Sequence, residues 1–304
     1  MFKKSELLKN RAYYLMALPA MVILFLFAYL PMPGIIVAFK KFNFLDGLFK
    51  SPWNGLNNFR FYFTSSDFLR TTFNTIWLNL NNIFWGTFLA VVFALLLNEM
   101  RNKSLKRLFQ SLMFIPYFFS FVIISKFVYI IFSIDHGLLN NIIRALGGEA
   151  VKWYMLPDVW RPILISTSVW KSLGYTVIIY LATISGIDEQ LFEAAQLDGA
   201  KRLQQIRHIL IPHLVPVISM LTLLAIGRIF NGDFGLVYAV IADNGQLYQK
   251  TDIIETYLYR ALFDNGGDFG SLAAVGLYQS VVGFVFVMGS NLIARKIDPD
   301  YSLF

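Results

Sequence analysis

The sequence predicts an all-α integral membrane protein with about six transmembrane helices. Of its 304 residues, 57% are hydrophobic and only 15% are charged, whereas about a quarter of the residues of a soluble domain are charged. Three runs have no charged side chain, namely residues 12–39, 71–98 and 269–294. Each run is longer than the ~20 residues that a helix needs to cross the hydrocarbon core of a bilayer.

Three further apolar segments contain isolated charges and complete the six spans. They cover residues 108–134 with Lys126, 162–187 with Lys171, and 214–242 with Arg228 and Asp233. The first run of the chain is too long for the core of a signal peptide, and no small-residue cleavage site follows it. We therefore expect that run to remain as the first span.

The distribution of Lys and Arg predicts the orientation of the chain. With a cytoplasmic N-terminus, the inside segments hold 4, 4, 3 and 2 basic residues, and the longer outside loops hold 5, 3 and 2. The inside segments are residues 1–11, 99–107, 188–213 and 295–304, and the outside loops are residues 40–70, 135–161 and 243–268. A higher density of basic residues marks the cytoplasmic side, so both termini are predicted to be cytoplasmic.

One transmembrane domain, residues 12–294, is therefore predicted between two short cytoplasmic tails, residues 1–11 and 295–304. The net charge of +7 follows from this membrane topology, because the basic residues gather in the inside segments. We accordingly expect no nucleic-acid partner.

The sequence lacks the motifs of the common catalytic and nucleotide-binding sites. It contains no Gly-Lys dipeptide, so there is no Walker A loop, and it has no HExxH, GxSxG or GxGxxG motif. It has no cysteine and only three histidines, of which His136 lies in an outside loop and His208 and His213 flank an inside segment, as solvated polar residues commonly do. We expect neither catalytic residues nor a metal site nor a cofactor in this chain.

One inside segment, residues 187–213, is long for a connection between two membrane helices and has the pattern of two short helices outside the bilayer. Asp188 is placed to cap the first helix, and Gly199 supplies the left-handed residue that ends it. Apolar residues at helical spacing resume at Leu203, and Pro212 is expected to stop the second helix before the next span. An interfacial amphipathic helix with no partner would have the same pattern.

This segment resembles the EAA loop of the permeases of ATP-binding-cassette (ABC) importers, which are the inner-membrane components of binding-protein-dependent transport systems. The stretch EAAQLDGA is followed by a basic and apolar helix and an Ile-Pro pair, with Ile211 in place of the commoner Leu. The matching residues are Glu193, Ala194, Ala195, Asp198, Gly199, Ala200 and Pro212.

The resemblance extends along most of the chain. SPWNGLNNF at residues 51–59, LLLNEMRNKSLKRLFQSLMFIPYF at 95–118, IIETYLYR at 253–260 and AVGLYQSVVG at 274–283 resemble maltose-type carbohydrate permeases. More narrowly, they resemble the branch associated with complex or polysaccharide-derived oligosaccharides.

The resemblance implies the fold and the partners of the chain. It implies a type I importer permease in a bacterial cell membrane, whose EAA segment is a coupling helix seated on an ATPase subunit. A second, similar permease, two ATPase subunits that hold ATP and Mg, and an extracellular solute-binding protein would complete the importer. Alternating access driven by closure of the ATPase pair is the implied mechanism.

Three other functions remain as alternatives. An ABC permease for amino acids, phosphate or peptides would have the same EAA loop. A secondary carrier would be expected to show inverted repeats and broken helices at the membrane midplane, and the sequence indicates neither. An enzyme acting on lipid-linked sugars would need a carboxylate or metal cluster at the membrane face, which the acidic residues do not form.

The charged residues within the predicted spans are candidates for a translocation pathway, because a charge in the bilayer normally faces a cavity or a partner. With nearby aromatic and amide side chains that suit sugar rings, the candidates are Lys126, Trp170, Lys171, Tyr175, Arg228, Asn231, Asp233, Tyr278 and Gln279. Even if Arg228 and Asp233 neutralise each other, the two lysines leave a positive excess suited to an acidic oligosaccharide. Alternatively, the lysines snorkel to an interface or pair with the second permease.

Overall fold

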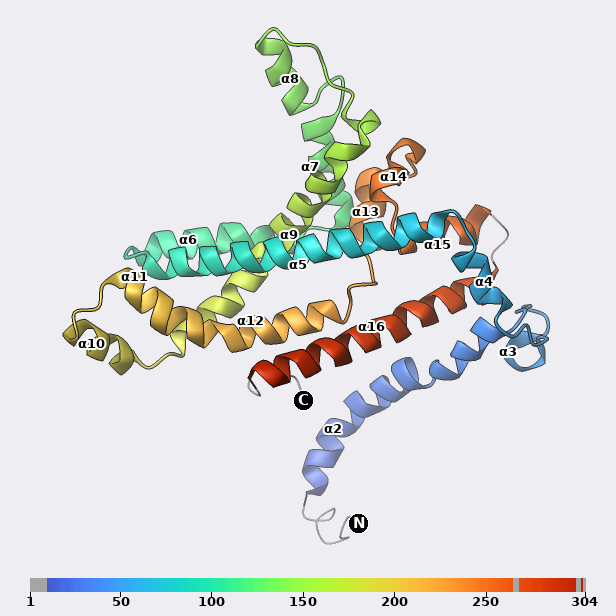
Figure 1. Ribbon diagram of the computed structural model, residues 1–304, viewed down its shortest axis with the longest axis horizontal. Coiled ribbons are helices and arrows are strands. Elements are labelled where there is room, and N and C mark those ends of the chain that lie inside the picture. Colours follow the sequence, from blue (N-terminus) through green and yellow to red (C-terminus); the bar gives the residue numbers. More distant parts are fainter. Residues whose placement is uncertain (1–9, 265–267, 299–301, 303–304) are drawn as a thin grey trace. The chain divides into compact units, whose positions relative to one another are not determined.

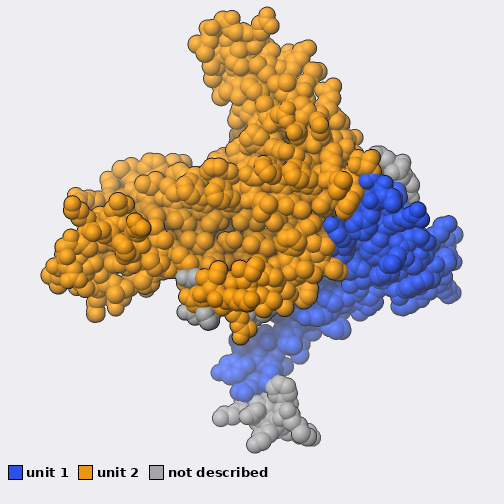
Figure 2. All heavy atoms as spheres, viewed as in Figure 1, with its two compact units in different colours: residues 1–65, 261–278 blue, residues 66–260, 279–304 orange. Residues whose placement is uncertain are grey.

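The computed structural model describes residues 10–264, 268–298 and 302, and all of its regular elements within these ranges are helical. Residues 1–9 of the predicted N-terminal tail, and residues 299–301, 303 and 304 of the predicted C-terminal tail, lie outside them. The chain forms two compact units, one of residues 1–65 and 261–278 and the other of residues 66–260 and 279–304 (Figure 2).

The helices of the first unit come from the N-terminal part of the chain (Figure 1). They are α2 (Arg11–Leu24), the π-helix η1 (Phe25–Tyr29), the 3-10 helix η2 (Met32–Phe39), α3 (Gly47–Lys50) and α4 (Asn57–Phe63). Two further helices, the short α15 (Ile254–Asp264) and the long α16 (Phe269–Ile297), contribute residues to both units.

The second unit contains the remaining elements. In chain order they are α5 (Asp67–Glu99), α6 (Lys103–Phe114), η3 (Ile115–Phe118), α7 (Phe121–Phe132), α8 (Leu138–Ala145), η4 (Trp153–Met155), α9 (Pro157–Ser185), α10 (Glu189–Leu197), α11 (Arg202–Gln205), η5 (Ile206–Leu210), α12 (Ile211–Ile226), α13 (Phe234–Ile241), η6 (Gly245–Leu247) and α14 (Tyr248–Thr251).

The number of membrane spans agrees with the sequence. Within the described residues, five helical segments are long and apolar enough to cross a bilayer, and a bent pair, α6–η3 with α7, brings the number up to six. The first of these segments, Arg11–Phe39, has a mean hydropathy of 2.3 and is only 6% buried. Its apolar side chains therefore suit contact with lipid or with another membrane protein.

In the first unit, the loop after the first span folds back on it through a buried amide. The side chain of Asn58 donates hydrogen bonds to the carbonyls of Ala38 and Lys40, at 2.9 and 2.8 Å. An added Cβ on Gly270 would lie 2.6 Å from both the Lys40 carbonyl and the Asn58 amide nitrogen. Glycine is therefore required where α16 crosses this turn.

The second unit is built around the packing of α5 against α9, which cross near their middles (Figure 1). Small buried residues on α5, Ala90 and Ala94, allow Val177 and Tyr180 of α9 to approach closely, and Leu210 completes this cluster. A second cluster, nearer the start of both helices, contains Leu78, Ile124, Trp160, Leu236 and Val240. Close side-chain packing of this kind holds membrane helices together, since lipid is as apolar as the helix surfaces.

The predicted span 108–134 is sharply bent. The helix α6–η3 and the helix α7 meet at 105°. Pro116 has no N–H to continue the helix, and Ser120 begins the new helix by accepting a hydrogen bond from the Ile123 N–H. The sequence predicted one continuous helix over residues 108–134, and this prediction was wrong because the segment consists of two helices joined at a sharp bend.

The prediction that Pro212 ends a separate short helix was also wrong. The segment Arg202–Ile226 is one helical span that runs through α11, η5 and α12. The five residues of η5 (Ile206–Leu210) form a π-helical turn directly before Ile211 and Pro212. A wider turn accommodates the missing N–H and the ring of Pro212 without ending the helix.

The predicted span 214–242 differs from the structure at both ends. The helix begins at Arg202 and ends at Ile226, and the short helix α13 begins only at Phe234. Residues 227–233 between them are not helical. The predicted bounds of this span were therefore wrong at both ends.

Gly174 provides a test of helix packing in the second unit. An added Cβ there would lie 2.1 Å from the Met113 carbonyl oxygen of α6, whereas one at Gly289 of α16 would have no atom within 4 Å. We expect Gly174→Ala to destabilise the protein by about 1–3 kcal/mol through overpacking. Gly289→Ala should be neutral or stabilising because alanine favours a helix. Thermal unfolding of the purified protein measures both, and equal midpoints for the two variants would contradict the packing.

Candidate functional site

A polar cavity of about 630 Å³ lies in the second unit, between α5, α9, α12 and the non-helical segment 227–233. Its wall carries amides and hydroxyls from α5 and α9, namely Asn79, Asn82, Ser168, Ser172 and Thr176. Four of the predicted pathway residues also line it, namely Tyr175, Arg228, Asn231 and Asp233. Hydrogen-bonding side chains within an otherwise apolar membrane unit are the chemistry that a polar, uncharged solute requires.

The charge on the cavity wall comes from Arg228 and Asp233, but the two residues have different surroundings. Asp233 caps α13 by accepting a hydrogen bond from the Leu236 N–H at 3.1 Å. Among the described residues no salt bridge joins Asp233 to Arg228, whose side chain is exposed to the cavity. Arg228 is therefore a cation available to a solute.

Side chains from three other helices hold the non-helical segment 227–233. Asn79 of α5 donates to the carbonyls of Ile229 and Asn231, at 2.8 and 3.0 Å. Gln279 of α16 donates to the Phe230 carbonyl at 2.5 Å and to a carboxylate oxygen of Glu255 at 2.9 Å. That oxygen also accepts a hydrogen bond from the Gly232 N–H at 2.8 Å.

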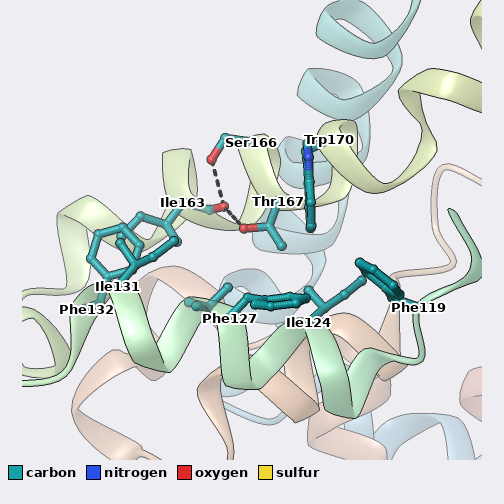
Figure 3. A pocket seen from close by; sticks show the side chains of 10 residues that line it. Phe119, Ile124, Phe127, Ile131, Phe132, Ile163, Ser166, Thr167 and Trp170 are labelled. Carbon is teal, nitrogen blue, oxygen red and sulfur yellow. Dashed lines mark hydrogen bonds between the residues drawn. The ribbon is translucent and has the colours of Figure 1, made fainter. Parts of the chain in front are cut away.

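The other predicted pathway residues lie elsewhere. Trp170 stands between two apolar grooves of about 520 and 590 Å³ on either side of α9, and Figure 3 shows it opposite the α7 side chains Phe127 and Ile124. Lys126 is exposed on α7 and does not line the polar cavity, and Tyr278 belongs to the first unit. Gln279 supports the cavity by holding the segment 227–233.

Lys171 lies at the bend between η3 and α7. Its ammonium group donates to the carbonyls of Tyr117 and Phe119, at 2.8 and 3.0 Å, and lies 5.5 and 5.3 Å from the rings of Tyr117 and Phe121. These carbonyls have lost their helical partners at the bend, and a cation near them is favourable. Lys171 thus stabilises a bent span, while its role in a pathway stays a prediction.

The predicted EAA loop forms a short helix at the end of the second unit where α5 terminates (Figure 1). Asp188 caps α10 by accepting from the Gln190 N–H at 3.0 Å, and Gly199 has the left-handed φ of +76°. Both conformational predictions are confirmed. Phe192 anchors the helix to the α5–α9 cluster, whereas Leu197 is 90% exposed.

The predicted coupling residues are mostly on the surface of this loop. Glu193, Ala194, Asp198 and Gly199 are exposed, and Ala195 and Ala200 are half-buried. Pro212 lies one helix further on, within the membrane span. The two exposed or half-exposed alanines leave a shallow surface that another protein can approach closely.

A charged cluster at the other end of α5 was missed in the sequence. Asp252 is fully buried, and its carboxylate pairs with Arg70 at 2.8 Å and with Arg260 at 2.7 Å. The Arg260 guanidinium lies 4.0 Å from the centre of the Tyr248 ring, and burial together with a hydrogen bond to Asp243 raises the pKa of Tyr248 to about 12. The tyrosine therefore stays protonated in any physiological condition.

Asn79 and Glu255 were also missed, although the amides of α5 gave a signal. Asn74, Asn79, Asn81 and Asn82 stand in a span without charges, and such polar residues normally face a protein interior or a cavity. Within the described residues, no group of three or more His, Cys, Asp or Glu side chains is arranged to hold a metal ion.

The helical membrane fold, the polar cavity and the exposed loop helix define a membrane transport subunit. The sequence profile of the family described as binding-protein-dependent transport system inner membrane component matches residues 83–299. The chain belongs to this family, and it is an ABC importer permease of a bacterial membrane. Because the chain belongs to this family, a secondary carrier and a membrane-embedded enzyme are excluded as alternative functions.

Two proteins of Bacillus subtilis (strain 168) are similar over nearly the whole chain. Protein LplB is 34% identical over 97% of this chain and 92% of its own length. The polygalacturonan/rhamnogalacturonan transport system permease protein YteP is 36% identical over 97% of this chain and 91% of its own length.

A solved structure is also similar in fold and sequence. A chain of a bacterial ABC transporter involved in the import of the acidic polysaccharide alginate has a TM-score of 0.85 and 31% identity. The match covers 97% of this chain and 98% of that one. A chain of a bacterial alginate ABC transporter in complex with an alginate pentasaccharide-bound periplasmic protein is equally similar, with a TM-score of 0.85 and 31% identity over 96% of this chain and 97% of that one.

Two asparagines of α5 test the support of the segment 227–233. Asn79→Leu removes both hydrogen bonds to that segment, and we expect a loss of about 1–3 kcal/mol because the carbonyls of Ile229 and Asn231 are left without these donors. The matched variant Asn81→Leu loses only a bond to Trp77 within its own helix and should cost much less. Thermal unfolding in the same lipid or detergent compares them, and an equal loss for both would contradict the role of Asn79.

Proposed function

We propose that this permease imports oligosaccharides released from polysaccharides, including acidic ones, with the polar cavity as its part of the translocation pathway. The supporting observation is the similarity over 97% of the chain to YteP, whose name specifies polygalacturonan and rhamnogalacturonan. The alginate importer, with 31% identity, also carries an acidic polymer. The cavity suits such a solute because amides and hydroxyls hydrogen-bond sugar rings and Arg228 attracts a uronate.

We further propose that α10 is the coupling helix, with Glu193, Ala194, Ala195, Asp198, Gly199 and Ala200 at or near its contact with an ATPase subunit. Phe192 fixes the helix to the membrane unit, and Leu197 on the exposed side is available to a partner. ATP-driven closure of the ATPase pair would move α10 and bias the permease between inward-facing and outward-facing states.

The complete importer in this proposal has a second, similar permease, two ATPase subunits that hold ATP and Mg, and an extracellular solute-binding protein. The binding-protein partner is supported by the complex of the alginate importer with its periplasmic protein. Both termini are cytoplasmic, so that α10 faces the ATPases, and residues 12–294 form the transmembrane part.

Gly199 tests the coupling role. Gly199→Val places a β-branched residue at a φ of +76°, a conformation that costs such residues of order 1–3 kcal/mol, and it should misplace α10. We expect the variant to assemble with the ATPases while transport and substrate-stimulated ATP hydrolysis fall sharply. The matched control is Gly147→Val, which has a similar φ of +84° in a loop remote from α10. Wild-type stimulation in purified Gly199→Val complexes would rule out this loop as the coupling element.

Arg228 tests the acidic substrate. We expect Arg228→Gln to reduce uptake of a uronate-containing oligosaccharide about tenfold, the effect of one lost charge-assisted hydrogen bond. Uptake of a neutral oligosaccharide of equal length should change little, and Arg228→Lys should retain most acidic uptake. Lys171→Gln should reduce both substrates alike, because Lys171 holds the bend of a span. A wild-type importer that takes up only the neutral sugar would end the proposal for acidic substrates.

A further inference from the structure

An ion pair joins the end of a membrane helix to the segment that follows α10. Glu99 is the last residue of α5, and Arg202 is the first residue of α11. The Arg202 Nε donates to a carboxylate oxygen of Glu99 at 2.6 Å. The two residues are 103 positions apart in the sequence, so only the tertiary fold brings them together.

Hydrogen bonds continue from this pair to the end of α10. Arg202 also donates to the side-chain oxygen of Gln205 at 2.8 Å, and the amide of that buried residue donates to the Ala200 carbonyl at 3.3 Å. The Ala200 N–H donates in turn to the Ala195 carbonyl of α10 at 2.9 Å. A connected series therefore leads from α10 to α5, through Ala200, Gln205, Arg202 and Glu99.

We propose that Glu99 and Arg202 are positioning residues that transmit the displacement of α10 to α5. This inference rests on the proposed coupling role of α10. The 33 residues of α5 form a helix about 50 Å long, and the same helix carries Asn79 and Asn82 to the cavity wall. Movement at Glu99 thus reaches the cavity through one rigid element.

The pair complements a connection that the chain already has. The helix after α10 continues without a stop from Arg202 through η5 into α12, so a displaced α10 moves α12 directly. α5 has no such covalent continuity with α10, since residues 100–188 separate them in the chain. Glu99 and Arg202 ensure that both walls of the cavity respond to the same displacement.

The surroundings of the pair indicate that it contributes little to the stability of the fold, which leaves transmission of movement as its role. The side chains of Arg202 and Glu99 are 47% and 32% exposed, and exposed ion pairs contribute little to stability. The second carboxylate oxygen of Glu99 is buried without a hydrogen-bond partner among the described residues, an arrangement that is unfavourable for stability. The pair nevertheless joins α5 directly to α11 through one short hydrogen bond of 2.6 Å.

Charge removal and charge reversal test this proposal in the complete importer reconstituted in vesicles. Glu99→Gln and Arg202→Gln should each lower the amount of oligosaccharide imported per ATP hydrolysed by about two- to fivefold, as expected for one half-exposed ion pair. The reversed pair, Glu99→Arg with Arg202→Glu, should recover most of that ratio. Arg101→Gln is the matched control, because Arg101 is an exposed cation beside Glu99 that forms no salt bridge in the described part of the chain.

A second measurement separates transmission from folding. Because the chain has no cysteine, Thr87→Cys gives a single thiol on α5 at the cavity. Its labelling rate should change on ATP binding in the wild-type background, and this change should disappear with Glu99→Gln.

The outcomes that would overturn the proposal are distinct from failure of the proposed function. Single variants that keep the wild-type import per ATP and the wild-type change in labelling would overturn the proposed role of Glu99 and Arg202 alone. So would a reversed pair that recovers nothing although both single variants have lost coupling. A wild-type importer that hydrolyses ATP without driving uptake would overturn the proposed function, and the proposed role of Glu99 and Arg202 with it.

Discussion

The second unit depends on one constraint, namely that main-chain polar groups within a bilayer must form hydrogen bonds inside the protein. Its two breaks, at the bend after η3 and at residues 227–233, would otherwise leave carbonyls without donors. Lys171 supplies donors at the first break, and Asn79 and Gln279 supply them at the second. These polar side chains therefore satisfy main-chain carbonyls of the fold, whether or not they also contact a solute.

The same constraint explains why α5 carries so many of the polar side chains that support the cavity and its surroundings. Its uncharged sequence makes it a full membrane span, and its amides face inward, where Asn79 holds the break and Asn82 lines the cavity. At one end Arg70 pairs with the buried Asp252, and at the other Glu99 pairs with Arg202. One helix thus connects the exposed loop, the cavity and the charged cluster at the opposite end.

The local conformation of the EAA loop was predictable, whereas its connection to the membrane was not. Asp188 caps a helix and Gly199 ends it because both effects act within a few residues. Pro212 was expected to stop a helix for an equally local reason. The π-helical turn before it, together with the burial of Leu210 and Leu214 against α5 and α9, keeps the helix continuous.

The sequence by itself determined the membrane class, the number of spans, the loop helix and the family, because these follow from hydropathy, the distribution of charge and local motifs. The tertiary structure decided which polar side chains meet. Arg228 lines the cavity, Lys171 donates to carbonyls at the bend after η3, and Glu99 forms an ion pair with Arg202. Such contacts depend on helix crossings and on breaks whose carbonyls are satisfied by residues far away in the chain, and no local pattern of residues specifies those partners.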